Sequence, residues 1–173
     1  MNNKENLSNE RPPLLPALIG TGFGSGFFPW GPGTAGSLLA VILWWMMGQW
    51  LFTDTESLSM ATTACVIGFT ILGVWATAQL RPYWGEDPSK VVVDEMVGMW
   101  IPLSLFSPAE HPLWILAALI LFRFFDIVKP LGIKWLDRKQ GPFWVMADDI
   151  LGGVYAAASL IALRIILALS LGQ

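Results

Sequence analysis

Residues 122–153, FRFFDIVKPLGIKWLDRKQGPFWVMADDILGG, bring acidic and basic residues together in a chain that is otherwise largely apolar. Arg123, Asp126 and Lys129 stand three residues apart. On a helix, Asp126 would therefore have one basic residue a turn before it and another a turn after it. Pro130 is expected to end that helix, because the residue before a proline is biased away from helical backbone angles.

The second half of this stretch repeats the association of acid and base. Asp137 and Arg138 lie in a short polar segment, and the acidic pair Asp148–Asp149 stands immediately before the apolar run 150–171. An acidic pair at the start of an apolar run is typical of a helix N-terminus. The pattern therefore predicts two charged clusters at a membrane edge, joined by about one loop of chain.

The composition indicates an integral membrane protein. Hydrophobic residues make up 54% of the chain and charged residues 13%, ten residues are Trp, and the mean hydropathy is +0.57. A net charge of −3 gives no indication of a nucleic acid partner. The single cysteine, Cys65, lies within an apolar run, so neither a disulfide framework nor a cysteine metal site is expected.

The apolar runs predict an all-α, multi-spanning helical membrane protein with four to five transmembrane helices. Residues 1–16 form a polar, proline-rich N-terminal tail that we expect to be mobile, and residues 17–173 form the membrane domain. The run 91–106 is short for a full crossing, so it either crosses tilted or only dips into the bilayer. The expected spans are residues 35–52, 58–80, 91–106, 112–129 and 150–171.

The basic residues predict the orientation of these spans, because Lys and Arg accumulate in cytoplasmic loops. With five crossings and the N-terminus inside, nearly all of the Lys and Arg residues fall on the cytoplasmic side. The expected outer loops, 53–57 and 107–111, contain neither Lys nor Arg. Arg164 is the exception, and its long side chain can reach the far interface from the last helix.

A glycine-rich segment, residues 31–36, contains the pattern GxGxxG. No predicted strand precedes it and no βαβ unit surrounds it, so a dinucleotide-binding motif is rejected. We expect Thr34 or Ser37 to cap the helix that begins here, which would leave backbone N–H groups free to hold an anion. The alternative is a flexible hinge before a helix.

The topology brings separate polar groups to one cytoplasmic edge. These groups are Thr34, Ser37, Asp94, Glu95, Arg123, Asp126, Asp148 and Asp149. Each acid alone could be a helix cap or an interfacial charge, and this applies above all to Asp148. Five acids together at membrane depth argue instead for a bound divalent cation, and ligands that are all oxygen favour Mg²⁺. The expected metal ligands are Asp94, Glu95, Asp126, Asp148 and Asp149.

The basic residues beside these acids suit a substrate that carries phosphate, and a site at the membrane edge suits a lipid head group. The only histidine, His111, is expected on the opposite face, and the chain has neither a Cys-x₅-Arg loop nor a DxDx[TV] motif. These absences leave a metal-activated water as the nucleophile, with a carboxylate as the general base and Arg or Lys stabilising the charge.

Five motifs in order resemble the phosphatidylglycerophosphatase A family: PGTAGS (32–37), VVVDEMVGMW (91–100), FRFFDIVKP (122–130), IKWLDR (133–138) and MADDILGGV (146–154). The resemblance implies a multihelical, Mg²⁺-dependent enzyme of the bacterial inner membrane. Its reaction would remove the terminal phosphate of phosphatidylglycerophosphate on the cytoplasmic face, giving phosphatidylglycerol, a precursor of cardiolipin.

The residues that match these motifs give the expected site. We expect Asp94, Glu95, Asp126 and Asp149 to be catalytic. We expect the substrate to be bound by Thr34, Ser37, Arg123, Lys129, Asp137 and Arg138. The sequence leaves open which acids bind metal, which one activates water, and whether one or two ions are used.

Two other classes of protein share part of this pattern. A CDP-alcohol phosphatidyltransferase also acts with Mg²⁺ at the membrane edge, but its DGxxAR…GxxxDxxxD signature is missing. A non-enzymatic cation-binding or transport protein would also carry intramembrane acids, yet here the charges gather at one edge and no acidic path continues across the bilayer. Release of inorganic phosphate from a lipid would separate the three.

Overall fold

The computed structural model describes residues 10–86, 88–110, 112–130 and 132–171, and this part of the chain contains helices and no strand. The all-α class predicted from the sequence is confirmed. The elements in chain order are α2 (Leu14–Gly20), the 3₁₀ helix η1 (Ser25–Phe27), α3 (Pro32–Trp50), α4 (Thr55–Trp84), α5 (Val93–Leu103), α6 (Pro112–Val128), α7 (Ile133–Asp137) and α8 (Pro142–Leu171).

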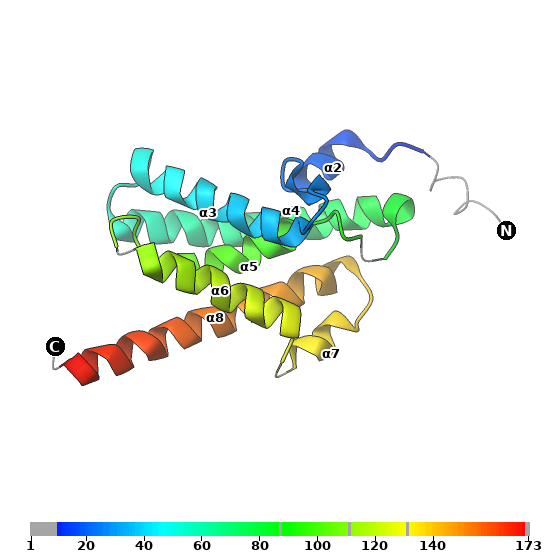
Figure 1. Cartoon of the computed structure of the whole chain (residues 1–173). Coiled ribbons are helices and arrows are strands. Elements are labelled where there is room, and N and C mark those ends of the chain that lie inside the picture. Colours follow the sequence, from blue (N-terminus) through cyan, green and yellow to red (C-terminus); the bar gives the residue numbers. More distant parts are fainter. Residues whose placement is uncertain (1–9, 87, 111, 131, 172–173) are drawn as a thin grey trace.

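The short helix α5 forms the centre of the bundle. Almost all of its residues are buried, and it packs against α3, α4, α6 and α8 (Figure 1). The Trp100 indole N–H donates a hydrogen bond of 2.9 Å to the Ala40 carbonyl on α3, and the indole ring packs edge-on against Phe69 of α4. Since α5 carries Asp94 and Glu95 in its first turn, this packing fixes the position of both acids.

The helices alternate in direction, so their charged ends gather at one end of the molecule. In Figure 1, α3 and α8 begin, and α4 and α6 end, at the side where α7 lies. The connections between α3 and α4 and between α5 and α6 lie at the opposite side, together with the C-terminal end of α8. Segments separated in sequence therefore become neighbours at this end.

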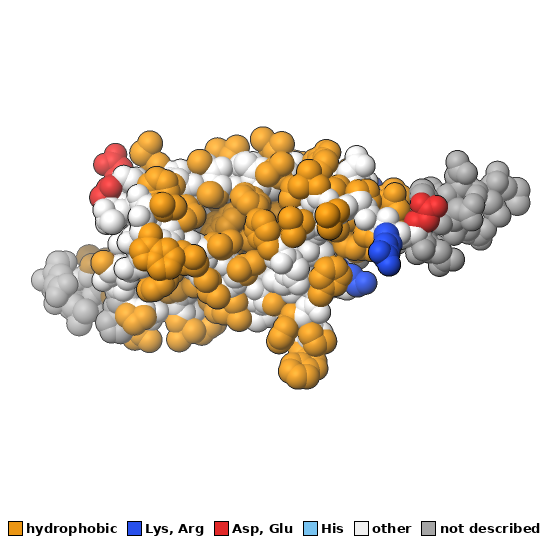
Figure 2. All heavy atoms as spheres, turned by 90° about the horizontal axis from the view of Figure 1, so that it is seen from above, with side chains coloured by type: hydrophobic (Ala, Val, Ile, Leu, Met, Phe, Trp, Pro, Cys, Tyr) orange, Lys and Arg blue, Asp and Glu red, His pale blue; other side chains and the backbone are white. Residues whose placement is uncertain are grey.

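The surface is that of a membrane protein. Two helices of the described residues, α4 and residues Pro142–Ser170 of α8, are long and apolar enough to cross a bilayer. In the most apolar 18-residue stretch of each helix, only 17% and 22% of the stretch is buried inside the protein. A soluble core helix would be mostly buried instead. Figure 2 shows apolar side chains over the middle of one face, with the charged side chains at its two ends.

The predicted four to five spans are not confirmed by these two helices. Helix α5 has 11 residues, which corresponds to about 17 Å at 1.5 Å per residue. This is too short for a hydrocarbon core of about 30 Å. The short apolar run 91–106 therefore contains a buried core helix, for which a length of this kind is typical.

Several boundaries differ from those predicted. The last helix begins at Pro142, not at residue 150, so Asp148 and Asp149 lie almost two turns inside α8 and not at its N-terminus. The expectation was wrong because Pro142 follows Gly141, whose φ is +134°, and together they start the helix earlier. Helix α4 continues past the expected end at residue 80 and through Pro82.

The N-terminal segment also differs from the expectation. Helix α2 begins at Leu14, within the expected tail 1–16. Residues 1–9 of that tail lie outside the described residues, as does His111.

Candidate active site

A cavity of about 540 Å³ lies at the end of the bundle where α3 begins and α6 ends. Its walls come from the starts of α3, α5 and α8, from the end of α6, from the segment that contains α7, and from described residues between α4 and α5, among them Ser89. The sequence-predicted residues that line it are Asp94, Glu95, Arg123, Asp126, Lys129, Asp137, Arg138, Asp148 and Asp149.

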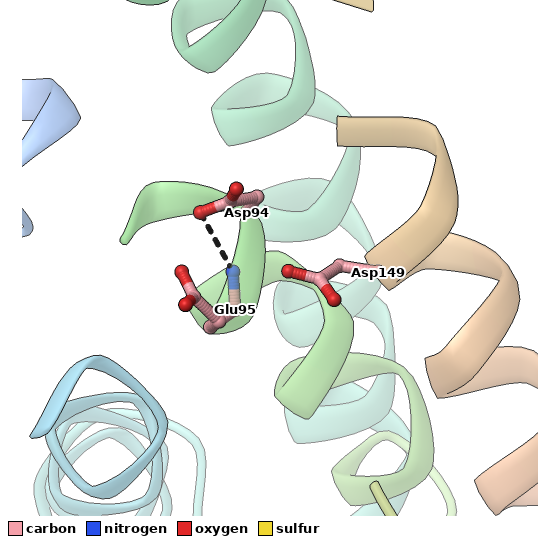
Figure 3. A group of neighbouring side chains, drawn as sticks. All are labelled: Asp94, Glu95 and Asp149. Atoms are coloured by element: carbon pink, nitrogen blue, oxygen red, sulfur yellow. Dashed lines mark hydrogen bonds between the residues drawn. The ribbon is translucent and has the colours of Figure 1, made fainter. Parts of the chain in front are cut away.

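Three carboxylates converge in this cavity. Asp94 and Glu95 come from the first turn of α5, and Asp149 comes from α8 (Figure 3). Each offers one oxygen, and these oxygens all lie within 4.8 Å of one another. Asp94 also accepts a hydrogen bond of 3.1 Å from the backbone N–H of Glu95, which holds the two neighbours in a fixed arrangement.

The same carboxylates have unused acceptor oxygens. Glu95 Oε2 and Asp149 Oδ1 are buried, and no described residue donates a hydrogen bond to either. Buried acceptors without a partner are rare, and close carboxylates repel one another. A bound cation would give the unpaired oxygens a partner and would offset the repulsion between the carboxylates. Since every candidate ligand atom is a carboxylate oxygen, the residues present fit a hard divalent ion such as Mg²⁺.

Arg123 supplies unused donors on the other side of the cavity. Its Nη1 lies 2.5 Å from Asp126 Oδ2, one turn along α6, and both side chains are mostly buried. Neither Nη1 nor Nε makes a hydrogen bond of good geometry with a described residue. A buried guanidinium with unused N–H groups next to a cation-binding cluster is suited to bind a phosphate group.

Lys129 binds two of the remaining acids. It follows α6 with a left-handed backbone angle, φ +50°, and its Nζ lies 2.6 Å from Asp148 and also contacts Asp137. Burial lowers the pKa of the Lys129 ammonium, but its hydrogen bonds to Asp137 and Asp148 outweigh burial and leave the pKa above its ordinary value. The lysine therefore stays charged and neutralises Asp148.

The five predicted metal ligands thus fall into two groups. Asp94, Glu95 and Asp149 form the close cluster, and none of the three is in an ion pair with a basic residue in the described part of the chain. Asp126 is paired with Arg123, and Asp148 is paired with Lys129. The cluster of three is the better candidate for a cation, because the charges of the other two acids are already compensated. A metal-binding role for Asp126 and Asp148 stays a prediction.

The start of α3 differs from the prediction. The helix is capped by Gly31 without a side-chain hydrogen bond, so neither Thr34 nor Ser37 is its cap. That expectation was wrong because Pro32 begins the helix earlier. The Ser37 hydroxyl donates to the Gly33 carbonyl at 2.9 Å, Thr34 is exposed, and neither residue lines the cavity.

The backbone of this segment contributes to the site instead. Gly31, Pro32 and Gly33 line the cavity. A Cβ atom on Gly33 would overlap the Glu95 carboxylate and would lie 3.0 Å from Arg123 Nη1. Position 33 therefore requires glycine, because the side chains of Glu95 and Arg123 both lie close to its backbone. The PG pair in PGTAGS was the available signal, but the prediction from the sequence rested on the hydroxyl groups of Thr34 and Ser37.

Sequence reasoning included Lys139 among the basic residues suited to phosphate, but it missed Gln140 and Trp144 at the rim of the cavity near α7. Lys139, Gln140 and Trp144 line the cavity. The Lys139 ammonium lies 3.4 Å from the centre of the Trp135 ring and 3.9 Å from that of Trp144, between two aromatic faces. A lysine flanked by tryptophans in sequence, WLDRKQGPFW, was the signal for this contact.

The fold and the cavity define a helical membrane protein with a polar site suited to a cation and a phosphate group. The family model described as phosphatidylglycerophosphatase A matches residues 18–164. The chain belongs to the phosphatidylglycerophosphatase A family, and it is an enzyme of the phosphatase class. The family membership predicted from five motifs is confirmed.

Individual relatives agree with this family. Phosphatidylglycerophosphatase A of Escherichia coli K12 is 37% identical over 145 residues, which cover 83% of this chain and 80% of that protein. The Haemophilus influenzae protein of the same name is 37% identical over 152 residues, covering 85% and 87%. A Bacteroides thetaiotaomicron protein provisionally named phosphatidylinositol-3-phosphatase is 51% identical over 148 residues, covering 85% and 92%. No solved structure gives a significant match.

Proposed function

We propose that this enzyme hydrolyses the terminal phosphate monoester of phosphatidylglycerophosphate to give phosphatidylglycerol and inorganic phosphate, with Mg²⁺ as its cofactor. This reaction belongs to bacterial phospholipid synthesis and leads to cardiolipin. One observation carries the proposal: among the described residues, nothing donates a hydrogen bond to the buried Glu95 Oε2 and Asp149 Oδ1, and these oxygens share a cavity with the Arg123 guanidinium, whose buried Nε makes no hydrogen bond. A phosphate ester together with a divalent cation would satisfy both sets of atoms.

The residues of the cavity have distinct roles in this reaction. Asp94, Glu95 and Asp149 would hold the cation, which when bound supplies a Lewis acid to the phosphoryl oxygens. The Arg123 N–H groups that are not paired with Asp126 bind the equatorial oxygens of the phosphoryl group. Asp126, beside Arg123, is the candidate to accept the proton of the attacking water. The water oxygen bonds to phosphorus, the bond to the glycerol oxygen breaks, and that oxygen takes up a proton.

The rim of the cavity suits the rest of the head group. Arg138 is exposed, lines the cavity, and has no ion pair among those found in the described residues. It can therefore bind the inner phosphodiester of the substrate. Lys129 is already bound to Asp137 and Asp148, so we assign it to holding α7 and α8 together beside the site.

A cytoplasmic site in a multi-pass inner-membrane protein is supported by the charges at the two ends. Basic residues surround the cavity, among them Lys129, Arg138 and Lys139. At the opposite end, Arg164 is neutralised by Glu110. This asymmetry agrees with the preference of basic residues for the cytoplasmic side.

A second candidate is hydrolysis of a phosphate monoester on an inositol head group. The 51% identity to the Bacteroides relative favours it. Both candidates remove a phosphate monoester from a phospholipid, so the cluster of acids and Arg123 would serve either one. The two candidate substrates differ in the alcohol of the head group, which is glycerol in one and inositol in the other. The rim of the cavity, where Lys139, Gln140 and Trp144 lie, would have to accept this alcohol.

Purified enzyme in mixed micelles would test both candidates. Phosphatidylglycerophosphate and phosphatidylinositol 3-phosphate are compared at equal surface concentration, with release of phosphate and mass analysis of the lipid products. We expect phosphate and phosphatidylglycerol from the first lipid, at the higher kcat/KM and without glycerol phosphate. Faster reaction of the inositol lipid would favour the second candidate. Cleavage of the inner diester, or no phosphate from either lipid, would contradict both.

A further inference from the structure

One face of α6 carries large apolar side chains that are exposed along the whole helix. They recur every three or four residues, so they form a single stripe on a helix of 3.6 residues per turn. These residues are Leu113, Leu116, Ile120, Phe124 and Ile127, and each is at least half exposed. In a membrane protein such a stripe faces lipid.

This stripe leads directly into the polar cavity. Ile127, at its end, is 68% exposed and also lines the cavity. Arg123 and Asp126, one turn and one residue before it, project into the cavity from the adjoining side of the helix. Ile127 therefore marks the boundary between the lipid-facing surface and the site.

The other exposed apolar surfaces do not have this continuity. Helix α4 also exposes large apolar residues, such as Ile67 and Ile71, but none of them lines the cavity. Among the described residues, Ile127 is the one exposed large apolar side chain in the wall of the cavity. A molecule that has one part in lipid and one part in the site can therefore extend from one to the other over this residue.

We propose that the acyl chains of the lipid substrate lie along the α6 stripe, and that Ile127 guides the head group from the bilayer into the cavity. This inference rests on the proposed function. Leu113 and Ile127 are 14 residues apart, about 21 Å along the helix. The stripe is thus longer than half of a hydrocarbon core, about 15 Å, which one acyl chain occupies.

The effect of this surface is on position and not on affinity. An acyl chain leaves other lipid when it moves to α6, so little additional apolar area is removed from water. What the contact fixes is where the head group stands relative to Arg123 and the carboxylates. Changes at Ile127 should therefore affect reaction of the diacyl lipid and leave a head group without acyl chains unaffected.

The first test compares Ile127→Gln with Val128→Gln. Val128 lies at the same helix end and is also exposed, but it does not line the cavity. Each variant is assayed on the diacyl lipid in mixed micelles and on the same head group after removal of both acyl chains. We expect Ile127→Gln to lower kcat/KM for the diacyl lipid about tenfold and to leave the soluble head group within twofold. Val128→Gln should change neither, and Ile127→Leu should retain wild-type values.

Other results would overturn the inference. Equal losses on both substrates would place Ile127 in the fold or in the chemistry, and no loss on either would exclude this route. These results differ from those expected if the proposed function is wrong, because the unmodified enzyme would then release no phosphate from any lipid tested.

A second test identifies what lies on the stripe. A photoreactive residue replaces Ile120 in the full chain in vesicles, and a matched variant carries it at Ile71, which is 66% exposed on α4. We expect more adduct with a labelled substrate lipid at position 120 than at position 71. Equal labelling at both positions, or a cross-link between two copies of the chain at position 120, would overturn the assignment.

Discussion

At the residue scale, the five acids at the cavity differ in their partners more than in their positions. Asp126 and Asp148 each have a basic side chain within ion-pair distance, whereas no ion pair between described residues involves Asp94, Glu95 or Asp149. Neutralising Asp94, Glu95 or Asp149 takes a charged ligand away from the cation site. Neutralising Asp126 or Asp148 instead leaves Arg123 or Lys129 without its acidic partner.

Asp149→Asn tests the cation-binding cluster. The change keeps the volume of the side chain but removes one of the three converging charges, so we expect activity to fall by a factor of about 100 or more. Phosphate release and Mg²⁺ binding by calorimetry measure the effect, and chelation with EDTA should abolish wild-type activity until Mg²⁺ is restored. Asp54→Asn, an exposed cap of α4, is the control. Normal Mg²⁺ binding by Asp149→Asn would refute this assignment.

Lys129→Met tests whether this lysine positions α7 and α8 or binds phosphate. The variant leaves Asp148 buried without its partner, which should destabilise the protein by about 1–3 kcal/mol. The double variant Lys129→Met, Asp148→Asn removes both charges and should recover most of that stability and part of the activity. Thermal unfolding in detergent and phosphate release are the measurements. A double variant that is stable but fully inactive would indicate direct binding of phosphate.

Gly33→Ala and Thr34→Ala separate the backbone of the PGTAGS segment from its hydroxyl groups. The added methyl group at position 33 would displace Glu95 and Arg123, so we expect a loss of activity of about tenfold or more. Thr34 is exposed and lies outside the cavity wall, so its variant should retain wild-type activity. The opposite result would restore the substrate-binding role that the sequence predicted for Thr34.

Much of the site could be predicted from the sequence, because charged residues at membrane depth are rare and each one stands out. The acids and bases predicted at the cytoplasmic edge, from Asp94 to Asp149, do line one cavity. The pairing of these residues could not be predicted. Whether Lys129 binds phosphate or Asp148 depends on helix positions to within a few ångströms, and the spacing along the chain does not contain that information.

At the scale of the elements, glycines allow α5 and α8 to pack closely enough to bring their acids together. A Cβ on Gly98 would clash with the Phe122 ring and would lie 2.7 Å from the Asp149 carbonyl oxygen. A Cβ on Gly153 would overlap the Gly98 carbonyl. The distance between Glu95 and Asp149 is therefore set by these two glycines on the facing helices.

Gly153→Ala and Gly152→Ala form a matched pair that tests this packing. The methyl group at 153 meets backbone atoms that cannot move away, whereas at 152 it would meet atoms at ordinary distances of 3.8 Å or more. We expect Gly153→Ala to destabilise the protein by about 1–3 kcal/mol and to weaken Mg²⁺ binding. Gly152→Ala should be neutral or slightly stabilising, because alanine favours helices. Equal effects of the two changes would exclude this packing argument.

Helix existence could be predicted, but helix boundaries could not. The apolar runs located the four longest helices and the central one. The sequence pattern predicts that charged residues mark helix ends. This holds for α6 but fails for α8, where Asp148 and Asp149 face the cavity from within the helix. Charge marks an end only where the side chain needs water, and a polar cavity removes that requirement.

At the scale of the whole molecule, an apolar middle separates two unlike ends. One end holds the cavity with its acids and bases, and the other holds the pair of Arg164 and Glu110 beside Phe106 and Trp114. An arginine between aromatic rings and a carboxylate is a suitable anchor at a membrane interface. The two ends therefore fit opposite surfaces of one bilayer.

Cysteine labelling tests this orientation, and the chain suits the experiment because Cys65 is its only cysteine. In a Cys65→Ser background, Ser89→Cys places a thiol at the cavity and Ser170→Cys places one near the C-terminal end of α8, and both serines are exposed. Helix α8 has 30 residues, about 45 Å, and so exceeds a hydrocarbon core of about 30 Å. If the cavity faces the cytoplasm, a membrane-impermeant maleimide added to intact cells should label position 170 and should reach position 89 only after the membrane is opened. Labelling of position 89 alone in intact cells would reverse the proposed orientation, and labelling of both from one side would show that α8 does not cross.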